Sequence, residues 1–398
     1  MKEGNKFKMI AKTLMGLEEV LGEEIRAIGG EDVEVINRAV SFMGDMETLY
    51  RANYTCRTAI AILKPIAEFE ANDEHELYDQ IYKIKWEHIL DVDCRFVIDP
   101  AVNSKIFRHS KYAALKSKDA IVDRFRKLFN QRPTIDLDNP DYYLGLHIYD
   151  NKVTVLLNSS GESLHKRGYR QKVGPAPINE VLAAGLIKLT GWQCDSHFFD
   201  PMCGSGTIVI EAAMLASNIP AQYYRKDYAF KKWKEYNIAE WKRVIEHENR
   251  KIKEFDHEIW GSDMSEKAIE AAEENVKFAK LHHDIELFNK PFTNQTPPEG
   301  KCLVVMNPPY GERMTGEWLN ELYESIGSRL KHDYGADKTV WIISSDFEAI
   351  KQIGLKPSKK IPLMNGALDC RFLKYELYDG SKKAKKQPKE ENSIDNEI

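Results

Sequence analysis

The stretch HFFDPMCGSGTIVIEAAMLA, residues 197–216, places a short apolar strand, an acidic residue, a glycine turn and a helical pattern in direct succession. Gly204 and Gly206 lack Cβ atoms, so the backbone amides of the turn can approach a ligand closely. In an open α/β sheet, ligands bind where such turns follow the carboxyl ends of strands. The GxGxxG spacing of a dinucleotide site is absent, and no lysine follows the glycines as in a Walker loop. The stretch therefore predicts a ligand site next to Asp200 that belongs to neither of these two classes.

The same order of elements recurs about 60 residues later, in EIWGSDMSEKAIEAAEENVKFAK, residues 258–280. Asp263 follows the strand, and an acidic residue there can accept hydrogen bonds from both hydroxyl groups of a ribose. The alternative is a helix N-cap, which Asp263 or Ser265 would provide equally well. The ribose interpretation gains support because Asp263 would pair with Asp200 and the glycine turn. Helix and strand patterns alternate from about residue 161 onward, which predicts a parallel, doubly wound sheet.

A third strand, in CLVVMNPPYGERM, residues 302–314, ends at Asn307, Pro308, Pro309 and Tyr310. Two consecutive prolines fix the backbone and remove donors, so the Asn307 side chain and the Pro308 carbonyl can both accept from one amine. An exocyclic amine on a heteroaromatic base is a poor nucleophile, because its lone pair is delocalised into the ring. Two acceptors would favour a pyramidal nitrogen aimed at an electrophilic methyl group, while Tyr310 offers a flat face to the base. The alternative is an ordinary turn after a strand.

The first 160 residues predict two smaller α+β units. The first unit runs strand, helix, strand from Lys6 to about Cys56, with residues 33–44 as its second strand. In the second unit, residues 103–132 hold nine Lys and Arg residues against two aspartates, an excess of plus 7, interleaved with Phe, Tyr and His. This texture is typical of a surface that follows phosphates and stacks bases, although a solvated helix face is the alternative. The candidate nucleic-acid contacts are Lys105, Arg108, Lys111, Lys116, Lys118 and Arg124.

Composition excludes several other classes of protein. The chain has 398 residues, which suggests two or three domains, and no apolar run approaches the roughly 20 residues of a membrane span. The first 25 residues lack the apolar core of a signal peptide, so we expect a cytoplasmic protein. The six cysteines stand singly with no CxxC pair, which argues against a zinc or iron–sulfur centre and against a disulfide framework. We therefore expect reduced thiols and no metal.

An insert at residues 222–257, rich in Tyr, Trp and Lys, separates the first two strand-and-helix units of the C-terminal part. We expect its tryptophans, Trp233 and Trp241, to cover the sheet, with contact to a substrate as the alternative.

Taken in order, DPMCGSGT, GSD and NPPYGERM resemble the motifs of S-adenosylmethionine-dependent class I methyltransferases of the amino-methylating group. Residues 161–378, which open with GESLHKRGYRQKVGPAPINEVLAAGL, resemble the bacterial family of ribosomal RNA guanine-N2 methyltransferases. Residues 1 to about 160 resemble the ferredoxin-like segment and THUMP domain that precede that catalytic domain. The resemblance covers nearly the whole chain.

The resemblance implies a role for individual residues. Those that would surround the methionine part of the cofactor are Asp200, Met202, Gly204 and Gly206, and Asp263 would hold its ribose. The family usually has an acidic residue near the adenine, where this chain offers Asn289 or Asn294, and we favour Asn294. The residues that would hold the target base are Asn307, Pro308 and Tyr310.

The segment HKRGYRQ, residues 165–171, lies just before the catalytic part. Its basic residues Lys166, Arg167 and Arg170 would guide RNA or line the cofactor pocket, and a basic linker between domains is the alternative. The THUMP resemblance favours RNA over DNA as the partner, since a patch of Lys and Arg suits recognition of shape and backbone.

These observations predict an α/β protein in which a class I (Rossmann-like) methyltransferase domain follows an α+β ferredoxin-like segment and a THUMP domain. We expect the segments to be 1–56, 57–160 and 161–380, with a disordered tail at 381–398. The expected activity is direct methyl transfer from S-adenosylmethionine to the 2-amino group of a guanosine in large-subunit (23S) ribosomal RNA. The alternatives are the same reaction on transfer RNA, adenine-N6 methylation of RNA, and a non-catalytic RNA-binding assembly factor. The target nucleotide and the choice between monomer and homodimer stay open.

Overall fold

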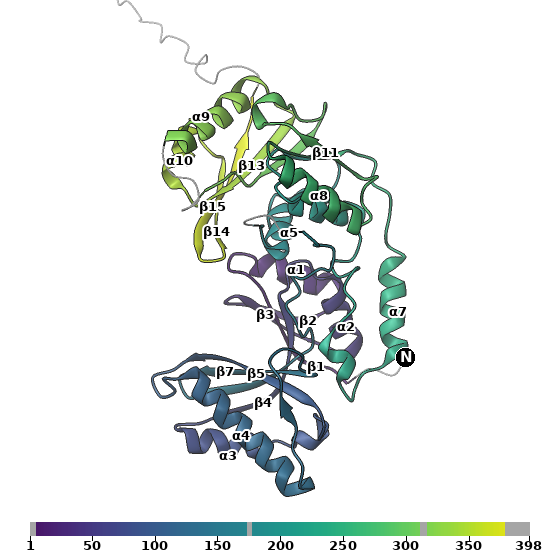
Figure 1. Cartoon of the computed structure of the whole chain (residues 1–398), viewed down its shortest axis with the longest axis vertical. Helices are drawn as coiled ribbons and strands as arrows, with labels where there is room; N and C mark the ends of the chain where they lie inside the picture. Colours follow the sequence, from purple (N-terminus) through teal and green to yellow (C-terminus); the bar gives the residue numbers. More distant parts are fainter. Residues whose placement is uncertain (1–4, 173–176, 311–316, 379–398) are drawn as a thin grey trace, which may run out of the picture.

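The computed structural model describes residues 5–172, 177–310 and 317–378 and contains two β-sheets (Figure 1). The molecule is elongated, with the N-terminal sheet towards one end and the C-terminal sheet towards the other (Figure 1). Within these ranges no helix is long and apolar enough to cross a membrane. All six cysteines are free. The predicted tail at 381–398 lies outside the described residues.

The N-terminal sheet has eight strands in the order β2-β3-β1-β4-β8-β7-β5-β6. The strands are β1 (Phe7–Lys12), β2 (Glu31–Ile36), β3 (Ala39–Gly44), β4 (Ala61–Glu70), β5 (Arg95–Asn103), β6 (Thr134–Ile135), β7 (Tyr142–Tyr149) and β8 (Lys152–Asn158). Its helices are α1 (Glu18–Ala27), α2 (Met46–Thr55), α3 (Glu74–Lys83) and α4 (Ser110–Phe129). The sheet runs through both predicted α+β units, because β4 pairs with β1 on one side and with β8 on the other. The boundary near residue 56 stays a prediction.

The prediction of a single strand over residues 33–44 is wrong. The chain turns back after β2, and Ile36 pairs with Ala39 across a two-residue loop to begin β3. Arg38 in that loop has a φ of +56°, the left-handed conformation that such tight hairpin turns require. Neither glycine nor proline marks the turn in the sequence, which is why the pattern reads as one continuous strand.

The C-terminal sheet has seven strands in the order β11-β10-β9-β12-β13-β15-β14. The strands are β9 (His197–Asp200), β10 (Ile259–Asp263), β11 (Ile285–Asn289), β12 (Cys302–Met306), β13 (Lys338–Ser344), β14 (Lys359–Asn365) and β15 (Leu368–Glu376). The first five are parallel, which confirms the predicted doubly wound sheet, and β15 runs antiparallel between β13 and β14. The accompanying helices are α5 (Glu180–Leu189), α6 (Thr207–Ala216), α8 (Glu266–Phe278), α9 (Glu317–His332) and α10 (Phe347–Gln352).

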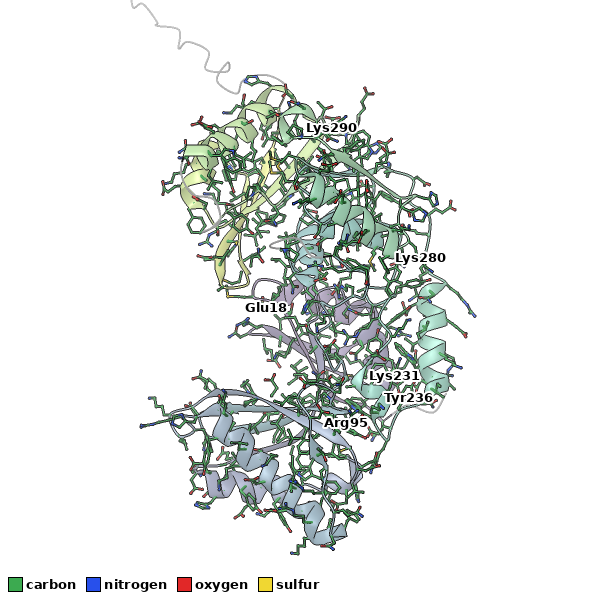
Figure 2. All side chains as sticks on the ribbon, viewed as in Figure 1. Glu18, Arg95, Lys231, Tyr236, Lys280 and Lys290 are labelled. Atoms are coloured by element: carbon green, nitrogen blue, oxygen red, sulfur yellow. The ribbon has the colours of Figure 1, made fainter. Side chains whose placement is uncertain are left out.

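The middle of the insert between β9 and β10 packs against the N-terminal domain, whereas Tyr224 and Phe255 near its two ends pack against the C-terminal core cluster. It contains α7 (Ile238–Asn249), and both Trp233 and Trp241 are buried in the N-terminal core cluster. The Trp241 ring lies 5.8 Å from the ring of Tyr50 on α2, centroid to centroid. Figure 2 shows the labelled insert residues Lys231 and Tyr236 beside this part of the molecule. The tryptophans are therefore core residues, as expected, but of the other sheet.

Arg57 forms buried hydrogen bonds that connect the N-terminal domain to the C-terminal one. It is almost fully buried, and its guanidinium donates to the carbonyl oxygens of Met214 (3.0 Å) and Ile219 (2.6 Å) at the end of α6. Its backbone amide donates to the Glu24 carboxylate on α1. Arg57 thus satisfies carbonyl groups at the end of a helix in the C-terminal domain from a position in the N-terminal one.

Arg167 completes this connection, and its burial corrects a prediction. Its side chain has no exposed surface and lies 3.3 Å from the equally buried carboxylate of Glu211 on α6. It also donates to the backbone carbonyl groups of Leu164 and Arg57. A guanidinium enclosed in this way cannot reach a nucleic acid, so Arg167 leaves the set of candidate RNA contacts.

We predict that Arg167→Met lowers the free energy of unfolding by about 3 kcal/mol, because it leaves the buried Glu211 carboxylate without its ion-pair partner. Thermal and urea unfolding measure the change. Lys166→Met is the matched control, since the neighbouring Lys166 side chain is 56% exposed and pairs only with Glu162 at the surface. Equal stability of the two variants would contradict the assignment of Arg167 to the domain junction.

Candidate active site and RNA surface

Three neighbouring strands of the C-terminal sheet end side by side at one edge. In the parallel register Gly261 of β10 pairs with Asp200 of β9, and Val304 of β12 pairs with Phe199. The chain segments that follow these strands therefore leave the sheet next to one another. They carry the three predicted polar residues Asp200, Asp263 and Asn307, which the fold brings to one place although they span more than a quarter of the chain.

The glycine turn after β9 is tied to the two acidic residues by its backbone amides. The amide of Met202 donates to Asp200 Oδ1 (3.1 Å), and the amide of Gly204 donates to Asp263 Oδ2 (3.0 Å). Gly204 has a φ of +55°, and apart from its chain neighbours no described residue has a heavy atom within 4 Å of the point where a Cβ would be. Hydrogen bonds to Asp200 and Asp263 thus fix the turn, while the described residues leave the space next to Gly204 open. Gly206, with a φ of +81°, then starts α6.

Asp200 is fully buried, and its second carboxylate oxygen, Oδ2, has no hydrogen-bond partner among the described residues. Burial raises the pKa of this carboxyl to about 8, and the nearby charge of Asp263 adds to the shift. A buried acceptor without a donor costs free energy in the folded protein. Asp200 is therefore suited to bind a ligand group that donates hydrogen bonds and carries positive charge.

Asp263 acts on the backbone with both oxygens, since Oδ1 also accepts from the amide of Ser265 (2.9 Å). The N-cap of α8 is Ser265, whose hydroxyl accepts from the amide of Ala268. Ser265, and not Asp263, therefore caps the helix. Asn289 lies opposite Asp263 in the register of β10 and β11, and its side chain donates to the Asp263 carbonyl. Asn294 ends a short helical turn and is exposed, and its contact with an adenine stays a prediction.

Asn307 follows β12 with its side-chain oxygen Oδ1 buried and without a partner in the described part of the chain. It is the second such acceptor at this edge of the sheet, after Asp200. Pro308 is buried, and the Pro309 carbonyl lies 3.5 Å from the hydroxyl of Tyr323 on α9, which also bonds Ser344. The rigid Pro-Pro segment is therefore packed against the sheet while the Asn307 acceptor remains unused. Residues 311–316, including Gly311, Glu312 and Arg313 of the motif, lie outside the described residues.

Tyr310 has a partner that the sequence patterns do not reveal. Its hydroxyl accepts a hydrogen bond of 2.8 Å from the side chain of Asn365, at the tip of the β14–β15 hairpin. Burial raises the pKa of Tyr310 well above its ordinary value, so the hydroxyl stays protonated near neutral pH. The signal for this hairpin in the sequence is Gly366, which lies between two runs that contain alternating apolar residues.

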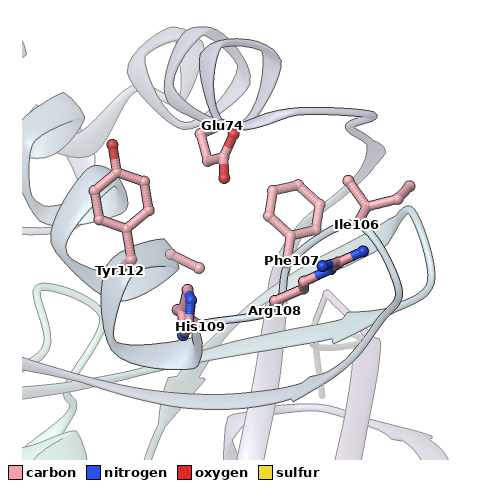
Figure 3. A pocket seen from close by; sticks show the side chains of 7 residues that line it. Glu74, Ile106, Phe107, Arg108, His109 and Tyr112 are labelled. Carbon is pink, nitrogen blue, oxygen red and sulfur yellow. The ribbon is translucent and has the colours of Figure 1, made fainter.

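The candidate RNA surface lies around the start of α4. Lys105, Arg108 and Lys111 are exposed there, and the Lys116 amine lies 5.7 Å from the ring centre of the exposed Tyr112. Beside them is an open cavity of about 150 Å³, with Tyr112 and Arg108 on its rim and Glu74 of α3 across from them (Figure 3). Cations, an exposed aromatic ring and a hollow at one place suit contact with the backbone and bases of an RNA strand.

Two other predicted contacts of this surface are engaged within the protein. Arg124 is largely buried and holds both oxygens of the Glu87 carboxylate at 2.7 and 2.6 Å. Its hydrogen bonds lower the pKa of Glu87 to about 2. Arg124 thus joins α4 to the segment after α3. Because Glu87 engages its guanidinium, the structure does not support the prediction that Arg124 contacts RNA. Lys118 pairs with the neighbouring Asp119 at 2.6 Å.

The basic residues of the linker before the catalytic domain differ in how far they are buried. Lys166 is exposed, whereas Arg170 is largely buried and pairs with Glu180 at 3.0 Å. Arg170 also donates to the hydroxyl of Thr207 (2.9 Å), the first residue of α6 after the glycine turn. Two roles are possible for Arg170, guiding RNA or lining the cofactor pocket, and this contact favours the second.

Comparison with protein families gives three matches in chain order. Residues 8–63 match the RlmL ferredoxin-like domain, residues 71–158 match the THUMP domain, and residues 167–374 match the RMKL-like methyltransferase domain. These matches confirm the predicted family and the predicted kind of each of the three parts.

Two curated proteins illustrate the similarity. The chain is 37% identical over 384 residues to the ribosomal RNA large subunit methyltransferase K/L of Syntrophotalea carbinolica, covering 93% of this chain and 53% of that protein. It is 34% identical over 372 residues to slr0064 of Synechocystis sp., named as an RNA methyltransferase, covering 92% and 96%. The chain therefore spans about half the length of the first relative and nearly all of the second.

Solved structures share the fold over almost the whole chain. SMU.472, named as a methyltransferase and solved in complex with SAH, has a TM-score of 0.85 at 29% identity, covering 96% of this chain and 100% of that one. A methylase from Clostridium difficile 630 has a TM-score of 0.85 at 31% identity, covering 94% and 98%. A Listeria monocytogenes protein named as an N6-adenine-specific DNA methylase has a TM-score of 0.83 at 29% identity, covering 93% and 96%.

We predict that Asp200→Asn stabilises the ligand-free protein increasingly as pH rises from about 4 to about 8. In the folded wild-type protein the carboxyl has a pKa of about 8, while an unfolded chain has the ordinary value of 3.8. The folded state therefore binds the extra proton, and wild-type stability falls through this range by up to about 1.4 kcal/mol per pH unit. Unfolding measured at pH values from 5 to 9 tests this difference.

Asp195→Asn is the control for this pH series, because Asp195 is exposed and its pKa is lowered by Lys301. Its titration is complete below the tested range, so its effect on stability should be independent of pH. A stability difference between wild type and Asp200→Asn that does not change with pH would show that Asp200 is ionised in the folded protein.

Proposed function

The chain belongs to the RMKL-like methyltransferase family, and from this premise we propose that it transfers a methyl group from S-adenosylmethionine to the 2-amino group of a guanosine in large-subunit (23S) ribosomal RNA. The observation that carries the proposal is the buried Asn307 Oδ1, which has no hydrogen-bond partner among the described residues, three positions before the half-buried Tyr310. An acceptor without a donor, beside an aromatic face and behind two prolines, suits the amino group of a stacked base.

The residues after β9 and β10 fit the cofactor. Within the described ranges, Asp200 Oδ2 is a buried acceptor without a donor, and only chain neighbours approach the Cβ position of Gly204. We propose that Asp200, Met202, Gly204 and Gly206 hold its methionine part, where Asp200 would accept from the ammonium group. Asp263 would hold the ribose and Asn294 the adenine, with Asn289 as the other candidate. When bound, S-adenosylmethionine supplies an electrophilic methyl group on a sulfonium sulfur.

The residues that follow β12 would make the amine nucleophilic. Asn307 Oδ1 and the Pro308 carbonyl would accept the two hydrogens of the amine, which weakens conjugation of its lone pair with the ring. Tyr310 would stack on the base and fix its plane. The amine nitrogen would then bond to the methyl carbon as the carbon–sulfur bond breaks, S-adenosylhomocysteine would leave as a neutral thioether, and the cationic nitrogen would lose its proton to water. The thiols of Cys203 and Cys302 are buried, and burial raises their pKa values, which argues against a thiolate nucleophile.

RNA as the substrate is supported by the THUMP match and by the exposed cations around the start of α4. Both curated relatives carry names that refer to RNA methylation, one of them to large-subunit ribosomal RNA. A guanosine within a helix would have to be flipped out to reach Tyr310, at a cost of a few kcal/mol. Transfer RNA remains the alternative substrate, and the name of the Listeria structure keeps adenine as the alternative base.

The proposal is tested by incubating the protein with labelled S-adenosylmethionine and total RNA from cells that lack the gene, followed by nucleoside analysis of size-separated RNA. We expect N2-methylguanosine in large-subunit RNA. Asn307→Ala should reduce turnover about 100-fold or more and leave cofactor affinity near the wild-type value, because Asn307 acts on the base.

The other outcomes separate the alternatives. Label in transfer RNA would change the substrate and keep the chemistry, and label in methyladenosine would contradict the base assignment. No label together with no cofactor binding by calorimetry would favour an RNA-binding factor. Equal loss of turnover and cofactor affinity in Asn307→Ala would mean that Asn307 belongs to the cofactor site.

We predict that the triple variant Lys105→Glu, Arg108→Glu and Lys111→Glu binds RNA more weakly and with a salt dependence flatter by about 2 to 3 in log K against log salt. The matched control reverses the same number of exposed charges on and directly after α7, at Lys242, Arg243 and Arg250. Filter binding at several salt concentrations gives both slopes. An unchanged slope in the first triple variant would remove the start of α4 from the RNA surface.

A further inference from the structure

We infer that Asn365 is a positioning residue that fixes the ring of Tyr310 for the target base, an inference that rests on the proposed function. Asn365 ends β14, where it lies opposite Leu368 across the hairpin. Its side-chain Nδ2 donates to the Tyr310 hydroxyl at 2.8 Å, although 55 residues separate the two positions. The hairpin thus reaches back to the segment that follows β12.

The turn itself does not require an asparagine at this position. The two residues between the paired positions are Gly366 and Ala367, and Gly366 has a φ of +61°. A glycine at the first loop position supplies the positive φ that a tight hairpin needs. Asn365 belongs to the paired strand and not to the loop, so the contact with Tyr310 is the specific use of its side chain.

The bond fixes the far end of the tyrosine ring. The near end is already fixed, because Tyr310 follows two prolines whose backbone is restrained. The ring packs against the core cluster of the C-terminal domain, and the Cys370 side chain interacts with the same hydroxyl. A ring anchored at both ends presents one defined face, which is what stacking of a flipped base requires.

The hairpin that carries Asn365 is itself supported by the N-terminal domain. Leu363 lies two residues before Asn365, so both side chains point to the same face of β14. A Cβ added at Gly16, in the loop between β1 and α1, would lie 2.7 Å from Leu363 Cδ2 and 3.0 Å from the Pro362 carbonyl oxygen. Leu17 from the same loop belongs to the core cluster that contains Leu363. Figure 1 shows the hairpin next to this N-terminal loop.

Steady-state kinetics with total RNA test the inference in three variants. Asn365→Ala and Tyr310→Phe should each lower kcat about tenfold and leave the KM for S-adenosylmethionine unchanged, because both remove the same hydrogen bond. The double variant should be no slower than either single one. Lys360→Ala is the control, since Lys360 is an exposed residue of the same strand and should keep wild-type kcat. A wild-type kcat in Asn365→Ala, or a double variant slowed by the product of both effects, would overturn the inference.

A readout that does not depend on activity separates this inference from the proposed function. Nuclear magnetic resonance of protein labelled with carbon-13 at tyrosine Cζ reports hydrogen bonding of each hydroxyl, and Tyr310→Phe assigns the signal. The Tyr310 signal should shift in Asn365→Ala and stay in place in Lys360→Ala. An unmoved signal overturns the positioning role by itself. A wild-type protein that methylates no RNA would instead overturn the proposed function, while the shift would still establish the contact.

Discussion

The parallel register of β9, β10 and β12 is the constraint on which the candidate active site depends. Because Gly261 and Val304 pair with Asp200 and Phe199, three segments distant in the chain leave the sheet side by side. The Gly204 and Met202 amides then bind the two acidic residues, which shapes the turn before any ligand is present. Two acceptors, Asp200 Oδ2 and Asn307 Oδ1, are buried and receive no hydrogen bond from the part of the chain that the structure describes. The proposed reaction needs this combination, one acceptor for a cationic cofactor and one for a base amine.

Contacts at the junction between the domains link the candidate active site to the N-terminal domain. Arg57 and Arg167 connect the N-terminal domain to α6, the helix that starts at the glycine turn. The loop around Gly16 supports the hairpin that bonds Tyr310. The first connection is buried, and the candidate RNA surface on α4 lies at the end of the molecule away from the C-terminal sheet (Figure 1).

Residues whose role depends on local order along the chain could be predicted from the sequence, whereas residues defined by distant contacts could not. Strand, acidic residue and glycine turn are adjacent in sequence, so the Asp200 turn and the parallel sheet follow from pattern alone. Charge does not reveal burial: Arg167 and Arg124 look like surface cations in the sequence, but a carboxylate 44 and 37 residues away binds each of them inside the protein. Asn365 and the tryptophans of the insert were missed or misplaced for the same reason, since their partners Tyr310 and Tyr50 lie 55 or more residues away.

The most direct test of the central claim is a structure of the protein with S-adenosylhomocysteine and an RNA that contains the target guanosine. The account predicts a base stacked on Tyr310, with its exocyclic amine within hydrogen-bond distance of Asn307 Oδ1 and the cofactor at Asp200 and the glycine turn. A base bound elsewhere, or an Asn307 side chain that contacts the cofactor and not the base, would contradict it.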